Sequence, residues 1–364
     1  MLLISLSSIF VALYIILIRI FKVGWKSIDV FQPDFFLPEE KLKVSVIVSC
    51  KNEEKSLPHL ISALKNQTYP DFELILINDH STDRTEEIMR ENLHFFENAI
   101  CIQAEGCGKK RAIAEGILRS SGDLIITTDA DCIPALTWIE IIVTFQVAYP
   151  SHLVICPVKL SDEKAFFARL QQLEFVSLVA SGAGAVGAQM PILCNAANLA
   201  FTKEAWLKSQ KDLKLEEQSG DDIFLLQSIK KQNGIVRFLR SEKAFVETES
   251  TENLTAFIHQ RRRWAGKSTA YTNWQLIFTA CIVFGVCAFQ LLLLAFSFFN
   301  VFYLYFFLFF FALKYWADER FLSDVSGFFS LKSVPFYSFC LSVVYPLYIV
   351  FTAVSALFFK PKAW

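Results

Sequence analysis

The chain has 364 residues, of which 54% are hydrophobic and 37 are phenylalanine, and its formal net charge at pH 7 is -1. This balance excludes the strongly basic footprint of a nucleic-acid-binding domain. The nine cysteines and five histidines are scattered, which argues against a disulfide framework and against a zinc site. More than half of the phenylalanines follow Trp274, so the composition predicts one sizeable domain joined to a C-terminal membrane region.

The N-terminal segment is a nearly uninterrupted apolar run over residues 1–18, followed by Arg19, Lys22 and Lys26. A secretory signal carries its positive charge before the apolar core, whereas here the charge follows it. We therefore predict a retained transmembrane anchor over residues 1–21, with its basic flank on the cytoplasmic side. A signal peptide that is removed is the alternative.

From residue 40 to residue 272 the pattern changes to short β-branched runs that alternate with helical stretches. Strands are expected at 44–48, 74–77, 100–103 and 124–128, and helices at 54–66, 83–91 and 109–120. This alternation predicts an α/β domain built on a parallel sheet with helices on both faces. Because ligands of such sheets bind beyond the carboxyl ends of the strands, the residues after each strand are the first site candidates.

Three of the predicted strands are followed by acidic or amide side chains. Asn52 and Glu54 follow the first strand, Asp79 follows the second, and Asp129 and Asp131 follow the fourth. An Asp-x-Asp triplet arises about once by chance in a chain of this length, but its place directly after an apolar strand makes it informative. Mg²⁺ and Mn²⁺ commonly join one or two carboxylates to substrate phosphates, so the pattern predicts a divalent metal at Asp129 and Asp131. Ordinary helix capping is the alternative.

Two further motifs stand at the starts of predicted helices. Lys109 belongs to the run Gly-Lys-Lys-Arg at 108–111, where backbone N–H groups and basic side chains could meet phosphate; a solvated helix start is the alternative. Asp221 and Asp222 open the helical run 223–229 and offer a candidate general base, with N-capping as the alternative.

The run Gln-Arg-Arg-Arg-Trp at 260–264 stands immediately before the next apolar region. A positive-inside flank explains its arginines, Arg263 among them, but explains neither Gln260 nor Trp264. Together with Lys267, these arginines predict that the middle domain lies in the cytoplasm.

The last region, residues 273–364, contains about three hydrophobic segments and is predicted to lie in the membrane. Its first stretch, 275–316, is about twice as long as a bilayer requires. Ser297 and Asn300 mark the turn of the predicted hairpin.

A further span is expected over about 335–359, with Pro346 as a tolerated kink. The mixed segment 317–334, which carries several charges, is expected to lie along the membrane interface. Strict alternation of spans puts Lys360 and Lys362 outside, against the usual bias, so a re-entrant late segment is the alternative.

Taken in order, these motifs resemble those of the family-2 glycosyltransferases, specifically the membrane-bound branch that includes cellulose, chitin and hyaluronan synthases and chitooligosaccharide synthases. The similarity covers about residues 43–264. It is carried by the opening strand with 52–54, the loop Asn-Asp-His-Ser-Thr-Asp-Arg-Thr at 78–85, Asp129 to Asp131, the segment 195–201, Asp221 with Asp222, and the Gln-x-x-Arg-Trp motif at 260–264. Two positions depart from the family pattern: Asn78 stands where a second acidic residue is common, and Phe224 replaces an aspartate.

The resemblance implies a GT-A type domain with flanking transmembrane helices, and a metal-dependent, inverting transfer from a nucleotide sugar, with UDP preferred. The catalytic base that it implies is Asp222, and the implied ligands of Mg²⁺ or Mn²⁺ are Asp131 and Asp129. The implied contacts with the donor are made by Asn52, Glu54, Asp79, Lys109 and Asp129. The implied acceptor or gating residues are Asn198, Asp221, Gln260, Arg263 and Trp264.

The expected acceptor is a lipid-linked or saccharide molecule at the cytoplasmic face of a bacterial inner membrane. Processive synthesis of a β-linked polysaccharide or a chitin-like oligosaccharide is the alternative within the class. A non-catalytic membrane scaffold is a remote alternative from another class. A dinucleotide-binding oxidoreductase is disfavoured, because Lys-Asn-Glu at 51–53 stands where a GxGxxG fingerprint would be needed.

Overall fold

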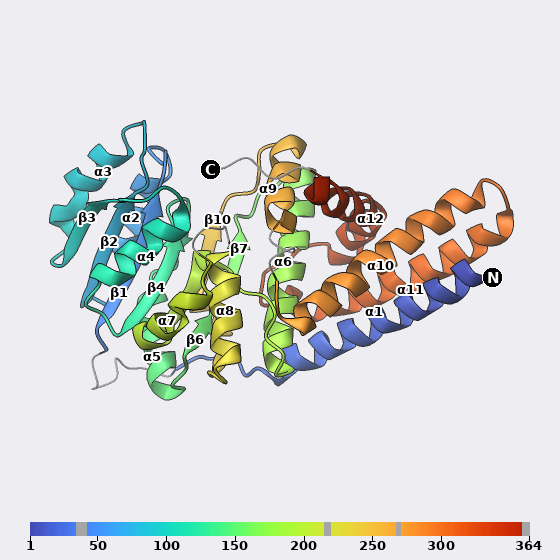
Figure 1. Ribbon diagram of the computed structural model, residues 1–364, viewed down its shortest axis with the longest axis horizontal. Helices are drawn as coiled ribbons and strands as arrows, with labels where there is room; N and C mark the ends of the chain where they lie inside the picture. Colours follow the sequence, from blue (N-terminus) through green and yellow to red (C-terminus); the bar gives the residue numbers. More distant parts are fainter. Residues whose placement is uncertain (34–41, 215–219, 267–270, 359–364) are drawn as a thin grey trace. The chain divides into compact units, whose positions relative to one another are not determined.

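The structure is a computed structural model that describes residues 1–33, 42–214, 220–266 and 271–358. It contains two compact units, each assembled from segments that are separate in the sequence (Figure 1). The helical unit comprises Met1–Ser27, Asp162–Ile192 and the chain from Ser250 onward, and the α/β unit comprises Ile28–Ser161 and Leu193–Glu249. The functional division predicted at 1–21, 40–272 and 273–364 stays a prediction. Lys267, Lys360 and Lys362 lie outside the described residues.

The α/β unit is built on a seven-stranded sheet in the order β3-β2-β1-β4-β8-β6-β9. The strands are β1 (Val44–Cys50), β2 (Phe72–Asn78), β3 (Ala99–Gln103), β4 (Leu124–Asp129), β6 (Leu153–Ile155), β8 (Leu199–Thr202) and β9 (Val236–Phe238). The four strands expected from the sequence are confirmed, and they pair in parallel. The β-branched and leucine side chains of β1, β2 and β4 are buried, which explains why a continuous apolar run forms each of these strands.

The expectation of an all-parallel sheet is wrong at β8, which runs antiparallel to both β4 and β6. The chain reaches β8 after leaving the α/β unit for α6 (Phe166–Gly187). No strand–helix–strand crossover within the sheet therefore fixes its direction. A second sheet of three short strands, β5 (Ile133–Pro134), β10 (Val246–Thr248) and β7 (Val158–Leu160), completes the unit.

Four helices of the α/β unit match those expected from the sequence: α2 (Leu57–Lys65), α3 (Thr85–Asn92), α4 (Lys109–Arg119) and α8 (Asp221–Lys231). The unit also contains α5 (Trp138–Ala148) and α7 (Lys203–Ser209), which were not predicted. The most apolar of them is α5, and most of its side chains are buried. The core of the unit therefore lies along the central strands and the helices packed on them.

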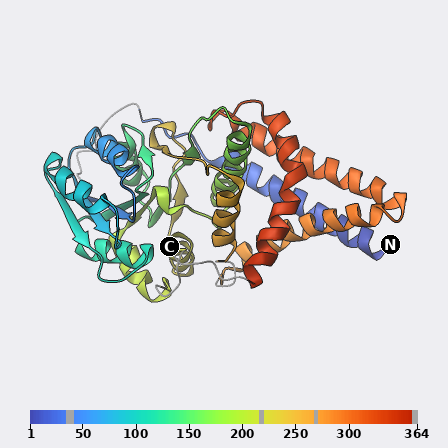
Figure 2. The same ribbon diagram turned by 90° about the horizontal axis from the view of Figure 1, so that it is seen from above.

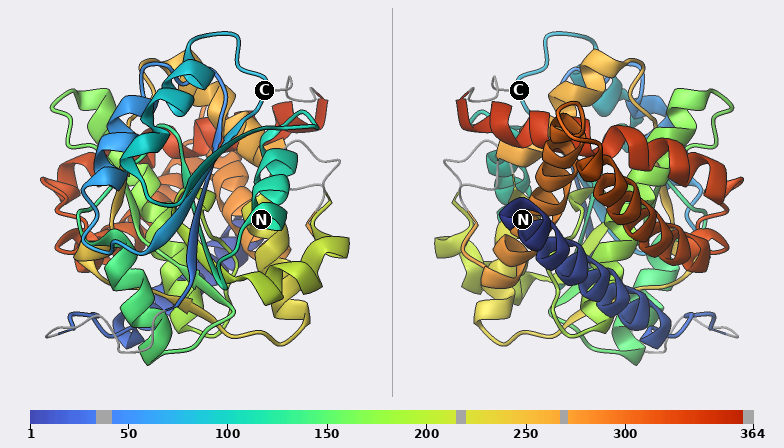
Figure 3. Two further views of the ribbon diagram at one scale, coloured as in Figure 1. Left: turned by 90° about the vertical axis from the view of Figure 1, so that its left-hand side faces the viewer. Right: turned by 90° about the vertical axis from the view of Figure 1, so that its right-hand side faces the viewer.

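The helical unit contains α1 (Leu2–Ser27), α6, α9 (Leu254–Gly266), α10 (Trp274–Ser297), α11 (Val301–Ser326) and α12 (Val334–Phe358). Within the described residues, α1, α10, α11 and α12 are long and apolar enough to cross a membrane. The predicted hairpin between α10 and α11 is present, and the Asn300 side chain accepts a hydrogen bond from the Phe302 backbone N–H at 2.9 Å at its turn. Helix α1 packs beside this hairpin (Figure 3).

The interface segment expected from residue 317 begins instead as a continuation of α11, which runs unbroken to Ser326. Two charges in this segment have partners: Asp318 pairs with Lys314 at 2.6 Å, and Asp324 pairs with Lys22 of α1 at 3.0 Å. Pairing lowers the cost of placing these charges on an otherwise apolar helix. The interfacial position of the segment stays a prediction.

Helices α1 and α6 approach closely through glycine. A Cβ built on Gly24 would lie 1.9 Å from the carbonyl oxygen of Gly184, and one built on Gly184 would lie 2.3 Å from that of Phe21. A larger residue at either glycine would push the two backbones apart. The contact ties the first helix of the chain to the segment that interrupts the α/β unit.

Candidate functional site

The carboxyl ends of β1, β2 and β4 lie level with one another, which brings the predicted site residues to one edge of the sheet. Cys50 at the end of β1 pairs in register with Asn78 of β2, and Ser49 pairs with Asp129 of β4. The loops that follow these strands therefore leave the sheet at the same place. This is the position where parallel α/β sheets bind their ligands.

Asp129 and Lys109 form the charged centre of this edge. The Lys109 Nζ lies 2.5 Å from Asp129 Oδ1, with side-chain exposures of 18% and 30%. Burial alone lowers the pKa of Lys109, but the carboxylates of Asp129 and Asp221 outweigh burial and hold the pKa above its ordinary value. The lysine at the start of α4 is thus a fixed positive charge between acids from β4 and α8.

Asp131 and Glu53 are carboxylates whose charges are poorly compensated. Burial, and then the charge of Asp129, raises the pKa of Asp131, with Lys109 opposing the shift. Burial, followed by the charge of Asp131, raises the pKa of Glu53 to about 7. Sequence reasoning chose the neighbours of Glu53 and missed Glu53 itself, because a loop has no periodicity that says which side chain turns toward the site.

These carboxylates suit a hard divalent cation, because they supply oxygen donors whose mutual repulsion a cation would relieve. Within the described residues, no group of three or more His, Cys, Asp or Glu side chains is arranged to hold a metal. Mg²⁺ and Mn²⁺ often take only one or two carboxylates and complete their coordination with water and substrate phosphate. Asp129 and Asp131 fit that pattern and do not fit a closed structural site.

The loops after β1 and β2 are joined by side-chain hydrogen bonds. Asn52 Oδ1 accepts from the Thr82 backbone N–H at 2.8 Å, and Ser81 Oγ accepts from the Asn52 N–H at 3.1 Å. Glu54 Oε2 accepts from the Arg84 N–H at 3.3 Å. The structure therefore gives Asn52 and Glu54 a loop-bracing role, and their contact with a donor stays a prediction.

Asp79 connects the loop after β2 to the start of α4. Its side chain is 1% exposed, and its two oxygens accept from the Gly108 N–H at 3.0 and 3.1 Å. The next residue, His80, has a φ of 57°, in the left-handed region that favours glycine.

Asp221 and Asp222 lie in the first turn of α8, and the N-cap position belongs to Gly220, with a φ of 95°. Neither aspartate is therefore the N-cap residue, which was the alternative to a general base. Asp222 is 9% exposed, and its Oδ1 accepts from the Ile223 N–H at 2.8 Å. Its carboxylate is thus held in one orientation in a largely water-excluded setting.

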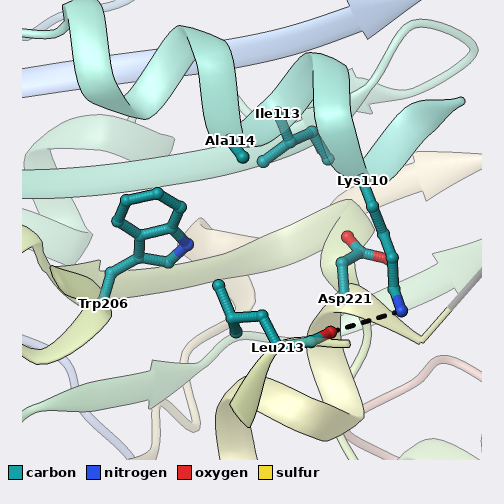
Figure 4. A pocket seen from close by; sticks show the side chains of 6 residues that line it. All are labelled: Lys110, Ile113, Ala114, Trp206, Leu213 and Asp221. Atoms are coloured by element: carbon teal, nitrogen blue, oxygen red, sulfur yellow. Dashed lines mark hydrogen bonds between the residues drawn. The ribbon is translucent and has the colours of Figure 1, made fainter. Parts of the chain in front are cut away.

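Asp221 also lines a pocket of ≈ 250 Å³ in the α/β unit. The other lining residues are Lys110, Ile113, Ala114, Trp206 and Leu213 (Figure 4). The buried ammonium of Lys110 donates to the carbonyl oxygens of Leu213 at 3.4 Å and Lys214 at 3.0 Å. Lys110 thereby ties the chain that leads toward α8 to α4.

Asn198 is fully buried and uses its amide within the α/β unit. Its Oδ1 accepts from Trp138 Nε1 at 2.8 Å, and its Nδ2 donates to the carbonyl oxygens of Pro157 at 2.7 Å and Ala244 at 2.8 Å. These bonds hold three segments together at the start of β8. The predicted acceptor contact of Asn198 stays a prediction beside this structural role.

Gln260, Arg263 and Trp264 lie on α9 in the helical unit, whereas the other predicted site residues lie in the α/β unit. The Gln260 Oε1 accepts from Arg261 Nη1 at 2.5 Å, and the Arg261 guanidinium lies 4.2 Å from the Trp264 ring centroid. The gating role predicted for the motif stays a prediction.

Residues 45–207 match the sequence model of Glycosyl transferase family 2. Undecaprenyl-phosphate 4-deoxy-4-formamido-L-arabinose transferase of Photorhabdus laumondii is 40% identical over 98 residues, 26% of this chain and 30% of that protein. Poly-beta-1,6-N-acetyl-D-glucosamine synthase of Staphylococcus epidermidis is 31% identical over 90 residues, 25% of this chain and 22% of that protein. The chain thus spans less than a third of the length of these curated relatives.

Among solved structures, the mannosyltransferase PcManGT from Pyrobaculum calidifontis in complex with GDP-Man and Mn²⁺ has a TM-score of 0.62 and 16% identity, over 98% of this chain and 99% of that one. The predicted GT-A type α/β fold with apolar helices is therefore confirmed. Residues 45–207, which extend from β1 to beyond β8, are thus similar in sequence to Glycosyl transferase family 2.

Proposed function

We propose that the chain is a membrane-bound, metal-dependent, inverting glycosyltransferase that moves a sugar from a nucleotide-sugar donor to an acceptor hydroxyl. The observation that carries the proposal is the set of charges at one sheet edge: Asp129 and Asp131, with Lys109 2.5 Å from Asp129 and Asp221 near enough to raise the pKa of Lys109. A binding scaffold has no need to keep under-compensated carboxylates at such a place.

Asp129 and Asp131 are the proposed ligands of Mg²⁺ or Mn²⁺. When bound, such a cation stabilises the negative charge of the departing diphosphate. The Lys109 ammonium is held beside Asp129 and adds a fixed positive charge to the same edge. The Mn²⁺ in the complex of the mannosyltransferase from Pyrobaculum calidifontis supports this choice of metal.

Asp222 is the proposed base. It accepts the proton of the acceptor hydroxyl while that oxygen bonds to the anomeric carbon and the bond from that carbon to the diphosphate oxygen breaks. The hydrogen bond from the Ile223 N–H orients the carboxylate for this transfer. Because there is one displacement, an α-linked donor gives a β-linked product.

A lipid-linked or saccharide acceptor at the cytoplasmic face of a bacterial inner membrane fits the four long apolar helices found among the described residues. An undecaprenyl-phosphate acceptor in the name of the Photorhabdus laumondii relative supports the lipid-linked case. Processive synthesis is the second candidate, because the Gln-x-x-Arg-Trp motif is present and the Staphylococcus epidermidis relative is named a polymer synthase.

A donor screen tests the proposal. Membranes that contain the chain are supplied with UDP-, GDP- and dTDP-sugars and a lipid extract, with Mn²⁺ or Mg²⁺ or with a chelator. The expected result is metal-dependent release of nucleoside diphosphate and an acceptor that gains the mass of one sugar, or of a ladder of sugars if the enzyme is processive. Metal-independent behaviour, or no consumption of any donor, contradicts the proposal.

A further inference from the structure

Arg261 occupies a variable position of the Gln-x-x-Arg-Trp motif, yet it is only 6% exposed. Phe257, with the same exposure, is the other buried residue of α9. Its guanidinium pairs with the carboxylate of Glu174 on α6: Nε donates to Oε1 at 3.0 Å, and Nη2 donates to Oε2. Glu174 is itself 2% exposed. This is a fork-to-fork ion pair in the interior of the helical unit.

A third helix completes the ion pair. The Tyr348 hydroxyl of α12 donates to Glu174 Oε1 at 2.9 Å, so one carboxylate is shared by α9 and α12. Figure 2 shows α12 beside α6 and α9. Pro346 lies two residues before Tyr348 inside α12, where proline removes one helical hydrogen bond and allows a local bend.

Arg261 also contacts the two motif residues that the positive-inside rule leaves unexplained. Its Nη1 donates to Gln260 Oε1 at 2.5 Å, and its guanidinium lies 4.2 Å from the Trp264 ring centroid and 4.3 Å from that of Phe257. The guanidinium group thus contacts both aromatic rings, and its ion pair with Glu174 fixes its plane. The orientation of Gln260 and Trp264 follows from that plane.

The segment before α9 is held by the same helix. Gln171, one turn before Glu174 on α6, accepts from Thr251 N at 3.0 Å and from Thr251 Oγ1 at 2.7 Å, and donates to the Thr251 carbonyl at 2.9 Å. Helix α6 therefore forms hydrogen bonds with the chain just before α9 and again at Arg261. With both points fixed, α9 has little freedom to slide or rotate on α6.

Stability alone does not account for a charged pair at this place. Apolar residues of similar volume in place of a buried ion pair are often neutral or stabilising, because both charges must lose water. What the pair adds is orientation: the guanidinium fork bonds in one plane, and an apolar side chain would offer neither the hydrogen bond to Gln260 nor the cation contact with Trp264.

We propose that Glu174 and Tyr348 are positioning residues which, through Arg261, set the orientation of Gln260 and Trp264; for catalysis this rests on the proposed function. The pair couples the last apolar helix of the described chain to the transferase motif. Loss of either partner should change how the acceptor is handled and leave donor binding by the α/β unit unchanged.

The first test reads orientation without activity. The full chain is labelled with 5-fluorotryptophan in detergent, and the ¹⁹F resonance of Trp264 is assigned with Trp264→Phe. In Glu174→Gln and in Tyr348→Phe this resonance should shift or broaden while those of Trp138 and Trp206 in the α/β unit stay in place. Tyr345→Phe is the matched control, because it removes a neighbouring hydroxyl of α12 that does not bond to Glu174.

The second test is a double-mutant cycle on transfer. Glu174→Gln should lower kcat/KM for the acceptor about tenfold or more while the KM for the donor stays within about twofold. Adding Glu174→Gln to Trp264→Phe should cost little further, because the two act as one unit. Arg261→Lys keeps the positive charge but not the planar guanidinium fork, so this variant should still lose transfer.

The inference fails if the Trp264 resonance is unchanged in Glu174→Gln and Tyr348→Phe, or if Glu174→Gln and Trp264→Phe reduce transfer independently. If the wild-type chain transfers no sugar at all, the proposed function fails instead, and the Trp264 resonance still decides whether Glu174 orients the motif. Unfolding temperatures of the variants separate either result from a general loss of fold.

Discussion

Two ion pairs with the same geometry lie in different units of the molecule. Glu204 and Lys208 on α7 of the α/β unit, and Lys314 and Asp318 on α11 of the helical unit, are both four residues apart with an N–O distance of 2.6 Å. The first pair has side-chain exposures of 61% for Lys208 and 76% for Glu204, and the second has 3% for Lys314 and 16% for Asp318. Solvent screens the first pair and not the second, so equal distances carry unequal energies.

The contrast extends to how each unit uses charge. In the α/β unit the acids of the proposed site stand at strand ends and at the start of α8, and burial raises the pKa of two of them, Glu53 and Asp131. In the helical unit the buried charges are paired with one another: Asp318 also accepts from the Tyr14 hydroxyl at 2.6 Å, and Lys314 lies over the Tyr345 ring. Variants of the site acids should lose activity, and variants of the Lys314–Asp318 pair should lose stability.

The largest expected effect is that of Asp222→Asn, which removes the proposed base and keeps its shape. Transfer should fall roughly 100- to 10,000-fold, because no base then takes the proton from the acceptor hydroxyl. Donor affinity, measured by calorimetry, should stay unchanged. Asp212→Asn is the control, since Asp212 contacts Ser228 and Lys231 of α8 away from the proposed chemistry and should leave transfer intact.

Next in size is Lys314→Met, which leaves Asp318 and Tyr14 without their cation. The free energy of unfolding should fall by about 3–5 kcal/mol, because an uncompensated charge stays buried. Lys208→Met, the matched change in the exposed pair, should shift the unfolding temperature little. Chemical unfolding of both variants in detergent compares them, and equal losses would contradict the difference drawn between the two units.

Asp131→Asn should lower transfer about 100-fold, since the cation loses a ligand and the leaving group loses its stabilisation. Burial and Asp129 raise the pKa of Asp131, so its charged form is less favoured in the folded chain than in the unfolded one. A neutral asparagine should therefore leave the unfolding temperature the same or higher in metal-free buffer. A variant that is both inactive and less stable would make Asp131 a structural residue.

The smallest effect concerns Glu53, whose pKa is raised to about 7 in the folded chain from an ordinary value of 4.5, first by burial. A raised pKa gives stability that is full below about pH 4.5 and is lost as the pH rises through about 7. Glu53→Gln cannot ionise, so its gain in unfolding temperature over wild type should grow from pH 5 to pH 8 in the presence of chelator. A difference that is constant with pH would contradict this assignment.

Much of the α/β unit was predictable, because its central strands are continuous apolar runs bounded by polar loops. The strand ends then located Asp79, Asp129 and Asp131 without further information. The reversed strand β8 was not predictable, since direction depends on a path through another unit. The three short strands of the second sheet were also beyond reach, because two or three residues show no period.

The long apolar helices of the helical unit were predictable in number, but the length of α11 and the polar contacts between the helices were not. The bond between Tyr14 and Asp318 joins residues 304 positions apart, and no local pattern records it. Without that partner the charges after Trp316 looked interfacial. Arg261 was read only as part of a basic flank for the same reason, because its partner Glu174 lies 87 positions away.

The most direct test of the central claim is the stoichiometry of one reaction on the purified full-length chain. Donor consumption, nucleoside diphosphate release and sugar gained by the acceptor are measured together, with Mn²⁺ and with chelator, for wild type and Asp222→Asn. The account predicts equal amounts of all three for wild type with metal, and near-background amounts in the other conditions. Transfer by Asp222→Asn at the wild-type rate, or transfer that the chelator does not reduce, would contradict it.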